Sequence, residues 1–378
     1  MIFKMRKAWI GIAAVVLVSA VVIFKGGLLR SAGNDSIGDG KPVVKIGAMF
    51  PLTGDNSIIG NVAYKAFAKA IEEANDNPEN RLHYKLLVED DRMNYQNVKT
   101  IATKYVFVDK VNALITFFST AARVVAPMAA ENKIINFNLA FTKDVYKSRY
   151  NFNNYITSEA QAERIAAFFA SKNIEKVTLL FQNFGGADDV LKSLSMRLEE
   201  KGITFETERF NSGERNFSIM VAKLKHSSKS QAVVINAFPP EIDILTREIR
   251  LQGIDKEKLI VLSDCVLMSH HIELYEGMYN IGSVMMSERL QKYTGLENEN
   301  PAYAAYLYDT GHILVGAYEA AYKGDGTVPT SEEVADILLI RKDYSGEVGK
   351  YSLDEKGQFH SQVEVTVVEN GHLVKVEF

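Results

Sequence analysis

Side chains with obvious chemical reactivity are few in this sequence and lie apart from one another. Cys265 is the single cysteine, and we expect a small, inert residue there, because a reactive thiol needs a nearby base. His270 and His271 are adjacent, so they point in different directions and lack the spacing of a zinc pair on a helix. The acidic run 89–91 follows an apolar stretch, which favours a strand end and turn cap over a cation site. These residues therefore predict no metal site.

Patterns that accompany phosphate, dinucleotide or acyl-transfer chemistry are also missing from the sequence. It contains no P-loop, no G-x-G-x-x-G and no G-x-S-x-G nucleophile elbow. We therefore expect no catalytic residue and no cofactor. An enzyme on a similar α/β scaffold is the alternative, and turnover of a bound compound would reveal it.

A binding site is indicated where Ser119 follows a predicted strand over 113–118 and opens a predicted helix. A serine at this position is a natural helix N-cap. Its hydroxyl, together with the free N–H groups of the helix start, is equally suited to bind a carboxylate. Ligands of open parallel sheets bind at such strand ends, so both roles stay open.

Apolar strands and amphipathic helices alternate from Val43 onward and must position this site. The strands are continuous apolar runs, as expected where helices cover both faces of a parallel sheet. Two such series follow each other, and a tail of helices and strands comes after them. The last strands, over 362–378, contain a hairpin turn at Glu369-Asn370-Gly371.

The composition fits a soluble protein of two domains with an export signal. The 378 residues are 47% hydrophobic and 24% charged, and the net charge of −4 lacks a concentrated basic block, so nucleic acid is not expected as a partner. Basic residues precede an uncharged run over 8–24, which is typical of a signal peptide or a retained membrane anchor. We expect residues 1–25 to form this segment and 26–42 a linker, with membrane contact only through the N-terminus.

Several short motifs then resemble the branched-chain amino-acid (Leu/Ile/Val) binding proteins of ABC importers, which are type I periplasmic binding proteins. The motifs stand in the same order as in that family and cover nearly everything from Val43 onward. They are Lys45-Ile-Gly-Ala-Met-Phe-Pro-Leu-Thr-Gly54, Glu89-Asp-Asp91, Arg215-Asn-Phe-Ser218 with Lys223-Leu-Lys225, and Asp354-Glu-Lys-Gly-Gln358.

The resemblance implies two doubly wound parallel-sheet lobes joined by a three-stranded hinge. One lobe would contain 43–157 plus 287–350, and the other 158–286 plus 351–378. This arrangement accounts for the tail, whose elements are divided between the two lobes.

The resemblance also implies which residues hold the ligand. Family members bind an amino acid's carboxylate and amine with a serine at one strand end and an alanine and a threonine after the next strand, which here are Ser119, Ala140 and Thr142. The second lobe of the family adds aromatic residues and an acid, and these positions are Phe184, Phe238 and Asp264.

This sequence departs from the family pattern toward a more apolar pocket. Both aromatic positions are Phe where the family often has Tyr, and the acid is Asp where Glu is usual. A further aromatic position in the first loop corresponds to Ile59, and Phe141 adds to the edge of the pocket. We expect a ligand with an apolar side chain.

The function implied by the resemblance is capture of a small molecule, such as an amino acid, in the periplasm or elsewhere outside the cytoplasm. The lobes would close on the ligand, and the membrane subunits of an ABC permease would receive it. A ligand-sensing protein, or a binder of amides, urea or short carboxylates, is the alternative on the same fold.

Overall fold

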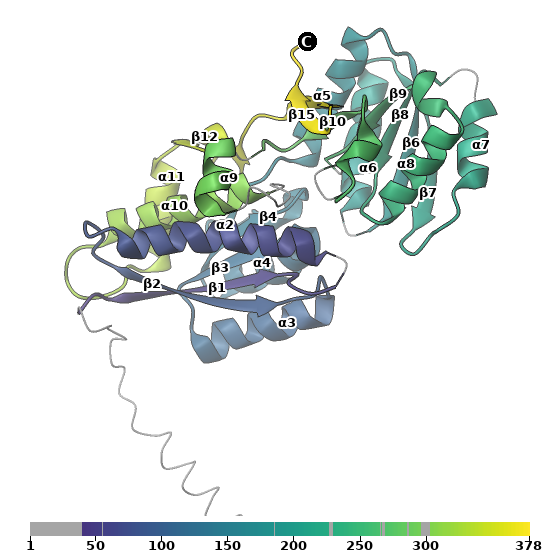
Figure 1. Cartoon of the computed structure of the whole chain (residues 1–378). Coiled ribbons are helices and arrows are strands. Elements are labelled where there is room, and N and C mark those ends of the chain that lie inside the picture. Colours follow the sequence, from purple (N-terminus) through teal and green to yellow (C-terminus); the bar gives the residue numbers. More distant parts are fainter. Residues whose placement is uncertain are drawn as a thin grey trace, which may run out of the picture.

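The computed structural model describes residues 40–54, 56–184, 186–226, 230–264, 266, 269–285, 287–295 and 303–378. The predicted signal or anchor segment, most of the predicted linker and Cys265 lie outside these ranges. Within them the chain forms two α/β lobes, placed side by side in Figure 1. None of the described helices is long and apolar enough to span a membrane.

The first lobe is built around a parallel sheet with the strand order β2-β1-β3-β4-β5. All its strands except the edge strand β2 are almost entirely buried, because helices α2 and α10 pack on one face and α3 and α4 on the other. Asn94 caps α3 by accepting hydrogen bonds from the next helical N–H groups. The elements are β1 (Val43–Phe50), α2 (Ser57–Asp76), β2 (His83–Asp90), α3 (Tyr95–Lys104), β3 (Ala113–Phe117), α4 (Phe118–Glu131), β4 (Ile135–Leu139) and β5 (Asn151–Asn153).

The second lobe repeats this topology. Its parallel strands have the order β10-β9-β8-β6-β7, with α5 and α6 on one face and α7 and α8 on the other. The elements are α5 (Ser158–Ser171), β6 (Lys176–Asn183), α6 (Ala187–Glu200), β7 (Thr204–Asn211), α7 (Ser218–His226), β8 (Ala232–Asn236), α8 (Glu241–Leu251), β9 (Leu259–Leu262) and β10 (Tyr279–Gly282).

The tail is shared between the lobes. Helices α10 and α11 return to the first lobe, whereas β14 and β15 extend the sheet of the second lobe as antiparallel strands. The predicted hairpin turn is confirmed, with Asn370 and Gly371 in the left-handed region at its tip. The elements are α9 (Glu288–Thr294), α10 (Ala304–Ala321), α11 (Ser331–Ile340), β11 (Asp343–Gly346), β12 (Gly349–Leu353), β13 (Phe359–His360), β14 (Glu364–Glu369) and β15 (His372–Lys375).

The chain passes between the lobes after β5, after β10 and after β13. The small sheet β11-β12-β13 stays with the first lobe, since the Phe359 ring packs 5.9 Å from that of Phe137 of β4 and Gln358 forms a β-bridge with Asn153 of β5. The predicted boundary at residue 350 lies inside β12, and the last passage falls near residue 361. The predicted fold class, two doubly wound parallel-sheet lobes with a three-stranded hinge, describes this architecture.

Candidate functional site

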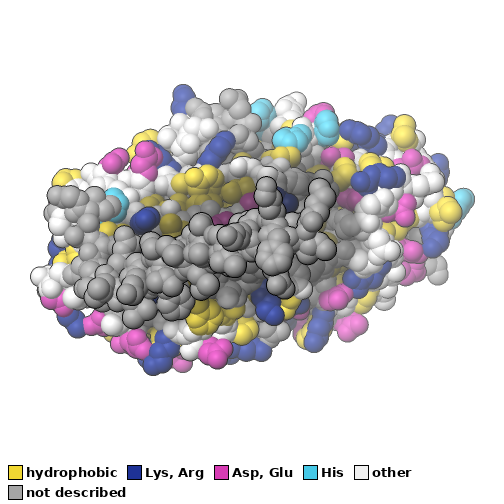
Figure 2. Space-filling view, turned by 90° about the horizontal axis from the view of Figure 1, so that it is seen from below, with side chains coloured by type: hydrophobic (Ala, Val, Ile, Leu, Met, Phe, Trp, Pro, Cys, Tyr) yellow, Lys and Arg dark blue, Asp and Glu magenta, His cyan; other side chains and the backbone are white. Residues whose placement is uncertain are grey.

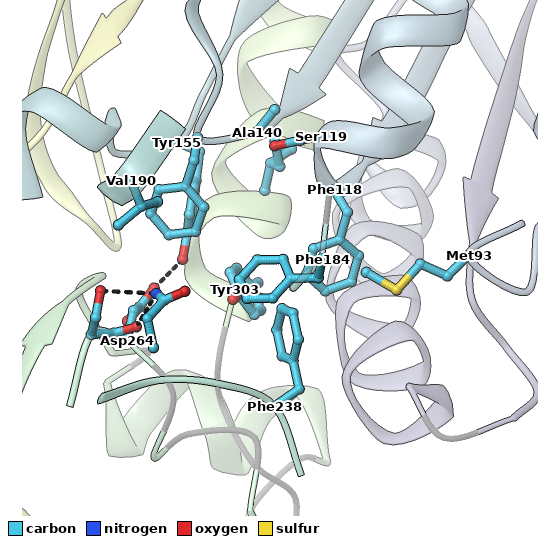
Figure 3. Close-up of a pocket in the computed structure, with 14 residues that line it drawn as sticks. Met93, Phe118, Ser119, Ala140, Tyr155, Phe184, Val190, Phe238, Asp264 and Tyr303 are labelled. Carbon is cyan, nitrogen blue, oxygen red and sulfur yellow. Dashed lines mark hydrogen bonds between the residues drawn. The ribbon is translucent and has the colours of Figure 1, made fainter. Parts of the chain in front are cut away.

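The carboxyl ends of both parallel sheets open on one pocket between the lobes (Figure 3). In each lobe the strand order reverses direction between two adjacent strands, β1 and β3 in the first lobe and β6 and β8 in the second. Loops that follow such strands diverge and leave a crevice, which is the usual ligand position in open α/β sheets. The residues after β3 and β4 form one wall, and those after β6, β8 and β9 form the facing wall.

Aromatic side chains from both lobes dominate the pocket. Phe184 lies with its ring centroid 4.5 Å from that of Phe238, and Phe118 of the first lobe meets Phe238 edge-on at 6.2 Å. Tyr303, which precedes α10, and Tyr155, from the first passage between the lobes, complete this cluster. The space left between these side chains is about 20 Å³, enough for one water molecule. A ligand must therefore separate the lobes or displace the rings.

Phe118 is a pocket residue that the sequence did not indicate. We predicted it as the end of a strand, but β3 ends at Phe117 and Phe118 begins α4 with φ of 67°. This left-handed conformation is unfavourable for a bulky residue and recurs at functional sites. The Phe118 ring lines the pocket, where it meets Phe238 edge-on (Figure 3). The sequence signal was weak, because a second Phe simply lengthens an apolar run.

Ser119 lies in the first turn of α4 and lines the pocket, with 5% of its surface exposed. Helix α4 has Phe117 as its N-cap and no capping side chain, so Ser119 does not serve as the N-cap. Gly186, the N-cap of α6 in the second lobe, sits directly against it: a Cβ there would be 3.1 Å from the Ser119 hydroxyl oxygen. Two helix N-termini thus meet at this serine.

Ala140 and Thr142 follow β4, but they differ in what they offer to a ligand. The Ala140 N–H donates to the side chain of Asn153 at 3.0 Å, and its carbonyl accepts from the same side chain at 3.0 Å. Ala140 lines the pocket, whereas Thr142 lines a neighbouring hollow. The Thr142 hydroxyl accepts a hydrogen bond from Arg123 at 3.1 Å, and Arg123 also pairs with Asp189 of the second lobe.

Asp264 follows β9 and is 2% exposed at the edge of the pocket. One carboxylate oxygen accepts from the N–H and the hydroxyl of Ser283, at 2.9 and 2.8 Å, and the other accepts from the hydroxyl of Tyr155. Figure 3 shows the Tyr155 hydroxyl directed at this carboxylate. Burial raises the pKa of Asp264 to about 6, although these hydrogen bonds oppose the rise. Tyr155 and Ser283 belong to two passages between the lobes, so Asp264 is tied to the hinge.

Asn236, the last residue of β8, is a second pocket residue that the sequence did not indicate. Its side-chain N–H donates to the hydroxyl of Ser263 at 3.1 Å and to the Ser263 carbonyl at 3.5 Å. The carbonyl acceptor requires the nitrogen on that side and therefore fixes the orientation of the amide. The opposite atom, Asn236 Oδ1, is buried and has no hydrogen-bond partner among the described residues.

The remaining predicted pocket residues divide between the pocket and the core. Phe184, Phe238 and Phe141 line the pocket, and the Phe141 ring lies 5.0 Å from that of Tyr155. The structure does not bring Ile59 there: it is buried in α2 within the core of the first lobe. A helix side chain with that burial stabilises the lobe by packing.

Candidate reactive groups found in the sequence take structural positions. Asp90 accepts hydrogen bonds from the Leu52 N–H and the Thr53 hydroxyl, and Glu89 pairs with Lys104. His271 approaches Glu273 at 3.3 Å. In the described part of the chain no group of His, Cys, Asp or Glu residues is arranged to hold a metal ion.

On the face shown in Figure 2, the described basic and acidic side chains are mixed, without a continuous patch of either sign.

Comparisons with known proteins agree with this architecture. A family model described as periplasmic binding protein matches residues 43–372. The Leu/Ile/Val-binding protein homolog 1 of Brucella suis is 25% identical over 333 residues, which are 83% of this chain and 87% of that protein. The homolog 2 of Brucella abortus is 24% identical over 348 residues, 87% of this chain and 90% of that protein.

Solved structures with the same fold include binding proteins with different ligands. The leucine-binding protein LivK of Thermotoga maritima has a TM-score of 0.77 at 22% identity, covering 88% of this chain and 98% of its own. LivJ of Streptococcus pneumoniae, in complex with isoleucine, has a TM-score of 0.75 at 23% identity, covering 88% and 100%. A solute-binding protein of Rhodopseudomonas palustris with 3,4-dihydroxybenzoic acid has a TM-score of 0.76 at 19% identity, covering 89% and 96%.

Proposed function

Because the chain belongs to the periplasmic binding protein family, we propose that it is the extracytoplasmic solute-binding component of an ABC importer. It captures a small amino acid-like ligand, a carboxylate on an apolar body, in the cleft between its two hinged lobes. The permease subunits in the membrane are its partners, and no covalent chemistry is required. The family match confirms the family that the sequence predicted. The ligand and the importer role are our proposal.

One observation carries this proposal: the switch points of both sheets face a single enclosed pocket lined by both lobes. A ligand held there contacts both lobes at once. It therefore favours the closed arrangement by the difference between its affinities for the closed and open forms. Such a ligand-dependent shape is what a transport partner can recognise.

The pocket residues suggest how the two ends of the ligand are held. Ser119 and the free N–H groups at the start of α4 suit a carboxylate, because the helix dipole adds favourable charge there. Phe118, Phe184 and Phe238 provide an apolar surface for the rest of the molecule. Isoleucine and 3,4-dihydroxybenzoic acid, bound in two structures of the same fold, share this combination of carboxylate and apolar body.

A thermal-shift screen over amino acids, organic acids, amides and urea tests the proposal. A ligand that binds only the folded state raises the melting temperature, by mass action, at concentrations above its Kd. We expect apolar carboxylates to raise it and urea to leave it unchanged. A flat response to every compound, or chemical conversion of one of them, would contradict a solute-binding role.

A further inference from the structure

Building on the proposed function, we propose that the ligand is an apolar monocarboxylate without an α-ammonium group, which also donates one neutral hydrogen bond to Asn236. This separates the site from one for a zwitterionic amino acid, which the sequence predicted. Most polar atoms of the pocket already have hydrogen-bond partners within the protein, whereas Asn236 Oδ1 has none among the described residues.

The atoms expected to receive an ammonium group next to Ser119 have other partners. The Ala140 carbonyl, which could accept from an ammonium group, already accepts from the side chain of Asn153 at 3.0 Å. Thr142 lines the neighbouring hollow, and its hydroxyl accepts from Arg123. The Arg123 guanidinium also pairs with Asp189, so it occupies the Thr142 hydroxyl without adding a net charge. The amine end of an amino acid therefore meets acceptors that already have hydrogen-bond partners.

Asp264, the acid expected to neutralise the ammonium, is committed to the hinge. It receives three hydrogen bonds, two from Ser283 and one from Tyr155. An ammonium group has three N–H donors and a full charge, and it is costly to bury without matching acceptors. Burial also raises the pKa of Asp264 to about 6, so this carboxyl takes up a proton readily when a second anion binds nearby.

The environment of Ser119 favours an anion. Ser119 is 5% exposed and lies where the start of α4 meets the start of α6 at Gly186. Both helix starts carry the positive end of a helix dipole. The acidic residues in the first turn of α6 are neutralised, Asp188 by Arg209 and Asp189 by Arg123.

Asn236 supplies the second recognition element. Its Oδ1 atom is buried in the pocket wall without a partner among the described residues, and an unpaired buried acceptor is unfavourable. A hydroxyl or amide N–H on the ligand satisfies it. An aromatic acid that carries a phenolic hydroxyl combines the three features: carboxylate, apolar ring and neutral donor.

Titration calorimetry with matched compounds tests the absence of the ammonium group. L-Phenylalanine and 3-phenylpropanoate differ only in that group, and 3-phenylpropanamide replaces the carboxylate by a neutral amide. We expect 3-phenylpropanoate to bind at least tenfold more tightly than either of the others. If L-phenylalanine or L-leucine binds more tightly than its deaminated analogue, this inference is wrong and the proposed function stands. If none of the acids or amino acids binds, both are wrong.

A second titration tests the role of Asn236. The 3- and 4-hydroxyphenyl analogues of 3-phenylpropanoate place a donor at different positions on the ring. We expect one of them to bind at least fivefold more tightly than the parent compound, and Asn236→Ala to abolish this gain. Asn280→Ala, which alters a buried asparagine of β10 outside the pocket, is the matched control and retains the gain. Equal affinities of all three acids for the unmodified protein would overturn the assignment of Asn236.

Asp264→Asn separates the two ligand classes independently. Removing a negative charge from the pocket edge tightens the binding of 3-phenylpropanoate, whereas an ammonium-binding site would lose affinity. The melting temperature of the free variant shows that it is folded. Loss of 3-phenylpropanoate binding by at least tenfold in a folded variant would overturn the inference.

Discussion

The two lobes share one sheet topology but differ in what lies beneath the pocket. In the first lobe, strands β4 and β5 carry buried asparagines that bond to one another: Asn136 donates to Asn138 and Asn151 at 3.0 and 2.8 Å. In the second lobe, the corresponding strand β9 is Leu-Ile-Val-Leu and packs in the apolar core.

This difference indicates different tasks for the lobes. The hydrogen-bonded asparagines hold the backbone around Ala140 in place, through Asn153 and Gln358. The second lobe presents Phe184 and Phe238, whose apolar contacts are not directional. We infer that the first lobe is the preformed floor of the site and that the second lobe closes over it.

Breaking the asparagine network should give the largest effect. Asn153→Ala leaves both backbone groups of Ala140 and the Oε1 atom of Gln358 without their partner, at a cost of about 1–3 kcal/mol for each buried group. We expect the free energy of unfolding to fall by about 4 kcal/mol in urea denaturation. Asn183→Ala, an exposed asparagine at the end of β6, is the control and costs under about 1 kcal/mol. Similar losses for both would remove the contrast between the lobes.

The buried acids of the two lobes predict the pH dependence of stability. Burial raises the pKa of Asp91 in the first lobe and of Asp264 in the second from 3.8 to about 6. The folded state then binds more protons than the unfolded state between pH 4 and 6, so stability is highest below this window and is lost as the pH rises through it.

For each acid, we expect the unfolding free energy to be about 1.5 kcal/mol higher at pH 5 than at pH 8. Asp264→Asn and Asp91→Asn should each remove one such contribution to the decrease in unfolding free energy between pH 5 and pH 8. The double variant should remove both contributions. Tyr155 and Ser283, which face Asp264, are uncharged in this range. An unchanged slope in Asp264→Asn would show that this acid does not titrate there.

Gly186→Ala sharpens the comparison at the point where the lobes touch. Its φ of 102° strains any other residue, and the added Cβ comes to 3.1 Å from the Ser119 hydroxyl oxygen. We expect ligand affinity to fall about fivefold, which corresponds to about 1 kcal/mol. Gly213→Ala has a similar backbone strain at φ of 90° but open space around it. That control should lose stability and keep its affinity; loss of affinity in both would assign the effect to strain alone.

The smallest effect is expected from the ion pair between the lobes. Arg123 of α4 and Asp189 of α6 are both partly exposed, and such pairs contribute about 0.2–1 kcal/mol. Arg123→Gln should weaken ligand binding about twofold at low salt and leave it unchanged at 0.5 M salt. Arg209→Gln removes a pair that lies within the second lobe and should not alter affinity. Equal, salt-independent effects would show that closure does not use the Arg123 pair.

Much of the architecture was predictable because it follows from local periodicity. Continuous apolar runs predicted the central parallel strands, and the resemblance to the family implied that the tail is divided between the lobes. Among the predicted site residues, Ser119, Ala140, Phe141, Phe184, Phe238 and Asp264 meet at one pocket. Their role in ligand binding stays a prediction.

Pocket residues that lie in the hinge and at some strand ends were not predicted from the sequence. Asn236 ends an apolar run like several core strands, and Tyr155 and Tyr303 lie in connecting segments without a pattern. Ile59 and Thr142 were expected at the pocket. Ile59 of α2 instead packs in the core of the first lobe, and Thr142 lines the adjacent hollow. A position after a strand is predictable, but the direction of its side chain depends on the packing of neighbouring elements.

The sequence by itself determined the strands, the helices and the strand ends where a ligand can lie, because these depend on neighbours a few residues away. Only the tertiary structure decided the hydrogen-bonding state of the site. Asp264 is bonded to Tyr155, which is 109 residues away along the chain, and Asn153 to Gln358, which is 205 residues away. Whether a polar atom is available to a ligand depends on such distant partners, and no local pattern records them.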